Sequence, residues 1–187
     1  MKTDPLNLPR RLILVTGPAR SGKSEWAETL AARSPHPSVI YLATAQIDPA
    51  DLEWQARIEQ HQRRRPPSWQ TLSIPFDLAG TIRASSVSEC LLVDSLGTWV
   101  ANFLDQENDA WENTLQELLE SLQQAAADVI LVAEETGWGV IPAYASGRMF
   151  RDRLGMLVRR VGAIANPVYL VTGGHVLNLS ELGSPLP

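Results

Sequence analysis

The sequence has little cysteine, no excess of positive charge and no long hydrophobic run. Its single cysteine, Cys90, cannot form an internal disulfide and cannot complete a metal site made of several cysteines. Because Cys90 stands in an apolar run, we expect a small buried side chain there rather than a nucleophile. This cysteine content is consistent with a cytoplasmic protein.

The charge balance and the hydropathy pattern argue against two further classes. The formal net charge is -5 and the pI is near 5.2, whereas proteins with an obligate nucleic-acid partner usually present a dominant positive surface. We therefore expect no nucleic-acid partner. No stretch approaches the length of a transmembrane helix, and the apolar run after Arg11 is too short for a signal sequence. We expect a soluble protein with no membrane span.

No linker rich in proline, glycine or serine divides the chain, and the sequence contains no repeat or low-complexity tract. A chain of 187 residues with 44% hydrophobic content can bury one core. We therefore expect a single domain over residues 1–187, with flexible ends at 1–10 and 183–187.

Short apolar runs alternate with longer segments of helical period, which is typical of a doubly wound α/β domain. Continuous apolar runs suit strands that are buried on both sides, so we expect a mainly parallel sheet with helices on both faces. The expected strands are residues 12–16, 39–43, 91–93, 129–133 and 168–171, and residues 175–179 could add an edge strand. The expected helices are residues 24–33, 51–65, 98–104, 109–127 and 148–165.

The most specific motif directly follows the first apolar run. It reads Gly17-Pro18-Ala19-Arg20-Ser21-Gly22-Lys23-Ser24 and has the spacing of a phosphate-binding loop (P-loop), in which glycines let backbone amides surround a phosphate. In such a loop Lys23 would reach the terminal phosphates and Ser24 would ligate Mg²⁺. The helix that follows would direct its positive end at the same anion. The sequence therefore predicts a site for a nucleoside triphosphate, against the alternative of a glycine-rich turn without a ligand.

Ligands of such a sheet bind beyond the carboxyl ends of its strands, so the residues there are further candidates. The second strand ends in Ala43, Thr44 and Ala45, which are suited to a nucleotide site but are explained equally well by a satisfied turn. Asp94 ends the third strand, where a Walker-B carboxylate would hold the hydration shell of Mg²⁺. The alternative is that Asp94 caps the next helix.

A second signal lies in residues 48–67. His61 is near the end of an apolar helix stripe and is followed by Gln62, Arg63, Arg64 and Arg65. Residue types alone leave two interpretations open. One is a solvated basic helix end, which the helix dipole favours. The other is a nucleophile or general base at His61, beside arginines that bind phosphate oxygens. His36 and His175 stand in turn-like contexts and are weaker candidates.

The order of these motifs resembles the bifunctional adenosylcobinamide kinase/adenosylcobinamide-phosphate guanylyltransferase family of cobalamin biosynthesis. The resemblance covers nearly the whole chain. It rests most on the ARIEQHQRRRPPSW segment around His61 and the DSLGTWVAN segment that begins at Asp94, which are more restrictive than the P-loop. The matching segments, in family order, are LILVTGPARSGKSEWAE, YLATAQ, ARIEQHQRRRPPSW, LLVDSLGTWVANFL, ETGWGVIP, GRMFRDRLG and VYLVTGG.

This resemblance implies a RecA-like P-loop domain that assembles as a homotrimer and catalyses two reactions. The first would phosphorylate the aminopropanol hydroxyl of adenosylcobinamide with ATP or GTP. The second would transfer GMP from GTP to that phosphate, with GMP carried covalently on His61. The resemblance further implies that residues 17–24 hold the triphosphate, that Thr44 and its neighbours and the arginines at 63–65 contact GTP, and that Asp94 lies near Mg²⁺ or the nucleotide.

Several positions differ from the family pattern. Pro18 replaces a second glycine, and Ser73, after a strand near Trp69, replaces a glutamate that often contacts the nucleotide. Glu134, which opens an acidic loop that could face a second substrate, stands where asparagine is common. Ala143-Tyr144 replace Glu-Asn, and Val158 replaces asparagine. These changes favour, as an alternative, a guanylyltransferase without kinase activity. A nucleotide-binding regulator without catalysis is the alternative from another class.

Overall fold

The structure is a computed structural model that describes residues 10–46 and 65–186. Within these residues seven strands form one sheet in the order β3-β2-β4-β5-β1-β6-β7. Neighbouring strands are parallel except β6 and β7, which pair antiparallel, so the expected mainly parallel sheet is confirmed. The strands are β1 (Leu12–Gly17), β2 (Ser38–Ala43), β3 (Gln70–Ser73), β4 (Glu89–Asp94), β5 (Asp128–Glu134), β6 (Val168–Thr172) and β7 (His175–Asn178).

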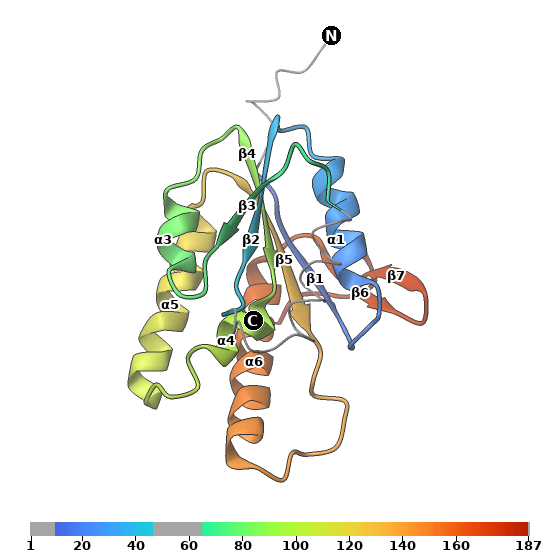
Figure 1. Ribbon diagram of the computed structural model, residues 1–187. Helices are drawn as coiled ribbons and strands as arrows, with labels where there is room; N and C mark the ends of the chain where they lie inside the picture. Colours follow the sequence, from blue (N-terminus) through green and yellow to red (C-terminus); the bar gives the residue numbers. More distant parts are fainter. Residues whose placement is uncertain (1–9, 47–64, 187) are drawn as a thin grey trace.

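Helices cover both faces of this sheet, as expected. Figure 1 shows α1 on one side of the strands and α3 and α5 on the other. The helices are α1 (Lys23–Ala32), α3 (Leu78–Arg83), α4 (Leu96–Ala101), α5 (Asn108–Gln124), α6 (Ala145–Ile164) and α7 (Leu179–Leu182). The α/β class therefore follows directly from the alternation of short apolar runs and longer amphipathic segments.

Each face of the sheet has its own hydrophobic core, which explains why β1 is apolar throughout. Ile13 and Val15 pack on the side of α1, whereas Leu12 and Leu14 pack into the larger core on the opposite face. That larger core also receives buried side chains from α3, α4, α5 and α6, including Trp99. Successive residues of a strand point to opposite faces, so a strand buried on both sides shows no polar alternation.

Some boundaries differ from those that the sequence patterns predict. α4 begins at Leu96 rather than Thr98 because Ser95 is its N-cap, in a capping box with Thr98. β3 is short and mostly exposed, and α3 has six residues, so neither shows a clear periodicity. The expected helix at 51–65 lies outside the described residues except for Arg65, which forms a bend.

The buried carboxylate of Asp128 forms an ion pair at the amino ends of the central strands. Asp128, at the start of β5, accepts hydrogen bonds of 2.8 Å from the backbone N and from Nε of Arg11. His36 Nε2 lies 3.3 Å from Asp128 Oδ2. The segment before β1, the turn after α1 and the start of β5 therefore share one carboxylate, at the end of the sheet opposite the P-loop.

Candidate nucleotide-binding and catalytic site

The P-loop connects the end of β1 to α1 by a tight turn (Figure 1). At Gly17 a Cβ atom would stand 2.3 Å from the carbonyl oxygen of Val171 and 2.8 Å from Ser21 Oγ, so no side chain fits there. Gly22 is the N-cap of α1 and has φ 92°, a left-handed conformation that strains residues with a Cβ. Both glycines of the motif are therefore required by the backbone.

The polar groups of this loop are suited to an anion. Lys23 is buried, and its Nζ donates to the carbonyl oxygen of Pro18 at 3.3 Å. The hydroxyls of Ser21 and Thr16 are buried and have no hydrogen-bond partner among the residues that the structure describes. Buried polar groups are ordinarily paired, and α1 also directs the unpaired amides of its first turn, which includes Ser24, toward the loop. The residues present therefore fit a bound phosphate chain.

Pro18 is compatible with this loop. Its carbonyl oxygen accepts hydrogen bonds from Lys23 Nζ and from the backbone N of Ser21, both at 3.3 Å. The loop thus uses the acceptor of Pro18, and the amide that proline lacks is not part of this arrangement. The departure from the family pattern at this position does not disrupt the loop.

Asp94 ends β4, which is separated from the P-loop strand by β5. Its Oδ2 accepts a hydrogen bond of 2.9 Å from the hydroxyl of Tyr41. The cap of the following helix is Ser95, whose hydroxyl accepts from the amide of Thr98. Asp94 therefore does not cap α4, and the alternative explanation of this carboxylate is excluded.

Thr44 follows β2 and is fully buried. Its Oγ1 donates to the carbonyl oxygen of Ser95 at 2.6 Å, accepts from the backbone N of Ser95 at 3.0 Å, and lies 2.6 Å from Thr98 Oγ1. This hydroxyl is fully used in joining the end of β2 to α4, as a satisfied turn requires. Ala43 and Ala45 flank it with half-buried side chains. A contact between these residues and the nucleotide stays a prediction.

A second carboxylate, Glu134, ends the strand next to the P-loop strand. Glu134 stands opposite Gly17 in the register of β1 and β5. Its Oε2 accepts from the backbone N of Gly97 at 3.0 Å, in the first turn of α4. Asp94 and Glu134 thus end neighbouring strands at the edge that carries the P-loop. The sequence signal for Glu134 is the same as for Asp94, an acidic residue directly after a buried strand.

Most of the histidine segment lies outside the described residues. His61, Gln62, Arg63 and Arg64 belong to that part, so their predicted roles are not tested. Arg65 is described: its guanidinium carbon lies 3.3 Å from the ring centroid of Tyr41, and its Nη1 donates to Thr71 Oγ1 at 3.2 Å. The structure therefore brings the end of this segment to the residue that contacts Asp94.

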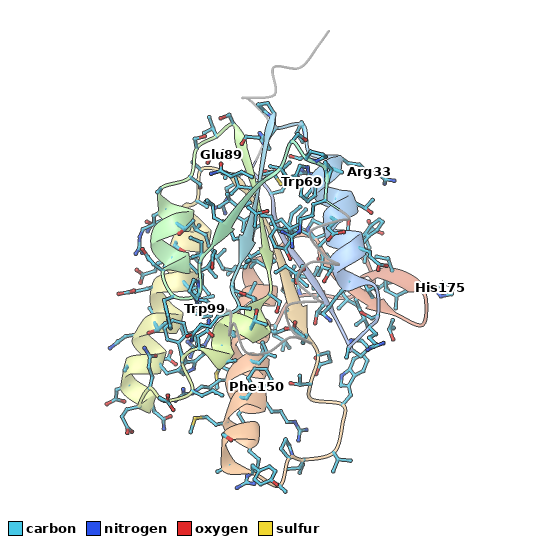
Figure 2. The ribbon with its side chains drawn as sticks, viewed as in Figure 1. Arg33, Trp69, Glu89, Trp99, Phe150 and His175 are labelled. Atoms are coloured by element: carbon cyan, nitrogen blue, oxygen red, sulfur yellow. The ribbon has the colours of Figure 1, made fainter. Side chains whose placement is uncertain are left out.

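The other candidate histidines have structural surroundings. His175 is exposed on the hairpin of β6 and β7, where Figure 2 shows it at the outer end of the molecule. His36 contacts Asp128 at the amino edge of the sheet. Cys90 is buried, and burial raises the pKa of its thiol to about 11, which opposes a role as a nucleophile. The expectation of a small buried residue at Cys90 is confirmed.

Four tryptophans are candidates for contacts with a large ligand or a subunit, and the structure separates them. Trp99 (Figure 2) and Trp111 belong to the larger core. Trp26 is half-buried against Tyr169. Trp138 is 64% exposed in the loop between β5 and α6. Of these four, Trp138 has the exposure that a ligand contact needs.

Two features are absent from residues 10–46 and 65–186. No group of three or more histidine, cysteine, aspartate or glutamate side chains there could hold a metal ion. No helix in this part of the chain is both long enough and apolar enough to cross a membrane. The predicted Mg²⁺ ligands Ser24 and Asp94 do not depend on such a cluster, since Mg²⁺ in nucleotide sites is usually held by one or two side chains together with phosphates and water.

Comparison with known proteins identifies the family. A family model described as cobinamide kinase / cobinamide phosphate guanyltransferase matches residues 13–179. The chain belongs to this family. The bifunctional adenosylcobalamin biosynthesis protein CobP of Pseudomonas aeruginosa is 39% identical over 175 residues, which cover 92% of this chain and 98% of that protein. The corresponding CobU of Escherichia coli is 38% identical over 178 residues, covering 87% and 96%.

The family resemblance predicted from the motifs is thus confirmed, and with it the class of kinase and guanylyltransferase in cobalamin biosynthesis. Solved structures share the α/β fold. A Pyrococcus horikoshii protein has a TM-score of 0.55 at 9% identity and covers 97% of both chains. An ATPase of a bacterial type III secretion system has a TM-score of 0.54 at 11% identity, covering 92% of this chain and 53% of that one. At these identities the likeness shows the fold alone.

Proposed function

We propose that this protein phosphorylates adenosylcobinamide with ATP or GTP and then transfers GMP from GTP to the product, with His61 carrying GMP between the two substrates. The observation that carries this proposal is the P-loop at the end of β1, with Lys23 buried in it and the hydroxyls of Ser21 and Thr16 left without partners. Membership of the cobinamide kinase / cobinamide phosphate guanyltransferase family supports both reactions.

In the first reaction the amides of residues 19–24 and the ammonium of Lys23 hold the triphosphate. The hydroxyl oxygen of the aminopropanol arm attacks the γ-phosphorus, the bond from that phosphorus to the bridging oxygen breaks, ADP or GDP leaves, and the hydroxyl proton passes to solvent. Ser24 and Asp94 would hold Mg²⁺, which neutralises charge on the phosphates when it is bound. Positioning and charge stabilisation supply most of the rate in such a transfer.

In the second reaction a neutral imidazole nitrogen of His61 attacks the α-phosphorus of GTP. A phosphorus–nitrogen bond forms and pyrophosphate leaves. A phosphate oxygen of adenosylcobinamide phosphate then attacks the same phosphorus, and the phosphorus–nitrogen bond breaks. Gln62, Arg63, Arg64 and Arg65 follow His61 directly, and the guanidinium groups of the three arginines would bind the phosphate oxygens. A cytoplasmic homotrimer is part of the same proposal.

The corrinoid is proposed to bind beside the loop of residues 135–144. Two arginines of α6 fix this loop: Arg151 donates to the carbonyl oxygen of Gly137 and Arg148 to that of Ala143, both at 2.7 Å. The loop leaves the sheet at the carboxyl end of β5, next to the P-loop strand, and carries several exposed apolar side chains, which a binding site for a large ligand would use. Its exposed apolar side chains are Trp138 (64%), Val140 (94%), Ile141 (66%) and Tyr144 (81%).

The proposal is tested by measuring the two products separately. We expect His61→Ala to abolish transfer of GMP to adenosylcobinamide phosphate and to leave phosphorylation of adenosylcobinamide within about threefold of wild type, because only the second reaction uses the histidine as a nucleophile. His175→Ala is the matched control, since His175 is exposed on the β6–β7 hairpin, and it should keep both activities. Equal GMP transfer by His61→Ala and wild type would exclude the covalent route.

The same assays separate the alternatives. A guanylyltransferase without kinase activity is favoured by Glu134, which stands where asparagine is common, and by Val158, which packs against the larger core. That enzyme would guanylylate adenosylcobinamide phosphate but transfer no label from γ-labelled ATP or GTP to adenosylcobinamide. A regulator would bind nucleotide and form neither product.

A further inference from the structure

Tyr41 connects two parts of the candidate site that are far apart in the sequence. It lies in β2 and is 3% exposed. Its hydroxyl donates to Asp94 Oδ2 at 2.9 Å, and the guanidinium carbon of Arg65 lies over its ring at 3.3 Å from the centroid. One buried side chain therefore contacts both the carboxylate at the end of β4 and the last arginine of the segment that follows His61.

The register of the strands explains how Tyr41 reaches the site. Tyr41 stands opposite Leu92, and Ala43 stands opposite Asp94. Residues two apart share a face of the sheet, so Tyr41, Leu92 and Asp94 belong to the face that also carries α1. The phenol extends along this face to the strand end. Tyr41 therefore contacts the Asp94 carboxylate from the face of the sheet that packs against α1.

The phenol is the donor in its contact with Asp94, because a carboxylate oxygen can only accept. Among the described residues, Tyr41 is the side chain that the structure gives as donor to this carboxylate. A hydrogen bond to Oδ2 restricts the orientation of the carboxylate and leaves Oδ1 for other ligands.

We propose that Tyr41 is a positioning residue of the nucleotide site: its hydroxyl orients Asp94 toward the hydration shell of Mg²⁺, and its ring supports Arg65 on the same face. This inference rests on the proposed function, which assigns Asp94 to Mg²⁺ and Arg65 to GTP. Tyr41 acts through these two residues. Its loss should therefore change the requirement for Mg²⁺ rather than the chemical step itself.

The test compares Tyr41→Phe with wild type in GMP transfer at saturating GTP over a series of Mg²⁺ concentrations. Phenylalanine keeps the ring beneath Arg65 and removes only the hydroxyl. We expect the Mg²⁺ concentration for half-maximal rate to rise about tenfold, as the loss of one hydrogen bond to a charged group predicts, with the rate at saturating Mg²⁺ within about threefold of wild type. Tyr169→Phe is the matched control, because Tyr169 packs on the same face against Trp26, and it should behave as wild type.

A second measurement asks whether Tyr41 acts through Asp94. In an Asp94→Asn background, Tyr41→Phe should raise the Mg²⁺ requirement no further, because the carboxylate that it orients is gone. Unchanged Mg²⁺ dependence in Tyr41→Phe, or full additivity of the two substitutions, would overturn the proposal. So would loss of the rate at every Mg²⁺ concentration, or failure of Tyr41→Phe to fold, since the ring and not the hydroxyl should supply the packing.

The proposed function and the positioning role of Tyr41 can be tested separately. If wild type forms no product, the proposed function fails, and Tyr41 is then judged by Mg²⁺-dependent binding of GTP measured calorimetrically. The tenfold shift between Tyr41→Phe and wild type should appear in that binding curve as well. Equal curves would contradict the positioning role independently of catalysis.

Discussion

Both proposed reactions should depend on the ammonium group of Lys23. It is buried in the P-loop, and its ammonium can exchange the carbonyl oxygen of Pro18, 3.3 Å away, for phosphate oxygens. We expect Lys23→Ala to lower kcat/KM for the triphosphate by at least about tenfold in both reactions, the effect of losing a hydrogen bond to a charged group. Steady-state kinetics with varied ATP or GTP measures this.

Arg33→Ala is the charge-matched control for Lys23→Ala. Arg33 is exposed and is the C-cap of α1, at the opposite end of the helix from the P-loop (Figure 2). It should leave both reactions unchanged. A Lys23→Ala protein that loses only one of the two activities would show that the reactions use separate triphosphate sites.

The roles of Asp94 and Thr44 could not be decided from local sequence. Asp94 could hold Mg²⁺ or cap a helix, and Thr44 could contact a nucleotide or complete a turn. The structure shows their present partners, Tyr41, 53 residues from Asp94, and Ser95, 51 residues from Thr44, while the roles toward Mg²⁺ and the nucleotide stay predictions. Residue types and spacing predict that a strand end carries a polar side chain, but not which distant partner already engages it.

At the scale of elements, the loop of residues 135–144 is where the second substrate should bind. Trp138→Ala removes the exposed aromatic ring of this loop. We expect KM for adenosylcobinamide to rise about tenfold, the effect of losing roughly 1–2 kcal/mol of apolar contact, with KM for the triphosphate unchanged. Kinetics with each substrate varied in turn checks the split.

Val87→Ala is the control for this loop. Val87 is 52% exposed and precedes β4, at the amino edge of the sheet, so it tests the effect of removing exposed apolar surface elsewhere. It should change neither KM. Equal KM values for adenosylcobinamide in Trp138→Ala and wild type would place the corrinoid away from this loop.

Elements with strong local signals were predictable, and the short ones were not. β1 has a continuous apolar run, and α5 and α6 have long amphipathic patterns, which specify their type from sequence. α3 contains Gly80 and only six residues, and its start depends on Asp77, whose side chain accepts from the amide of Gly80. A single cap of this kind marks a helix end but carries no periodicity, so the helix is visible only in the structure.

At the scale of the whole molecule, the Asp128 carboxylate should contribute strongly to stability. It is buried and accepts hydrogen bonds from the backbone N and Nε of Arg11, so Asp128→Ala leaves two donors of Arg11 without their acceptor. Because the Arg11 side chain is 37% exposed, water can replace part of this pairing, and we expect the free energy of unfolding to fall by about 2 kcal/mol. Glu112→Ala breaks the exposed pair between Glu112 and Arg160 and should cost less than about 1 kcal/mol.

Urea unfolding followed by circular dichroism compares these two variants with wild type. A similar midpoint for Asp128→Ala and Glu112→Ala would show that the amino edge of the sheet does not depend on the buried pair. The nucleotide site lies at the opposite edge, so kcat of the folded Asp128→Ala protein should match that of wild type.

The class of the fold was predictable, whereas its strand order was not. Alternating apolar runs and helices predict a mainly parallel sheet, but the P-loop strand pairs with β5 and β6, which come much later in the chain. These pairings place Glu134 opposite Gly17 and bring Asp94 to the same edge as the P-loop. The set of residues that meet at the site therefore depends on pairing between strands that are far apart in the sequence, and no local motif shows this pairing.

The central claim, covalent transfer of GMP through His61, is tested most directly by locating the adduct. Wild type is incubated with GTP and Mg²⁺, denatured, digested and analysed by peptide mass spectrometry. The account predicts GMP on the peptide that contains His61, released by acid as expected for a phosphoramidate, and no adduct in His61→Ala. An adduct on another residue, or GMP transfer by wild type without any adduct, would contradict it.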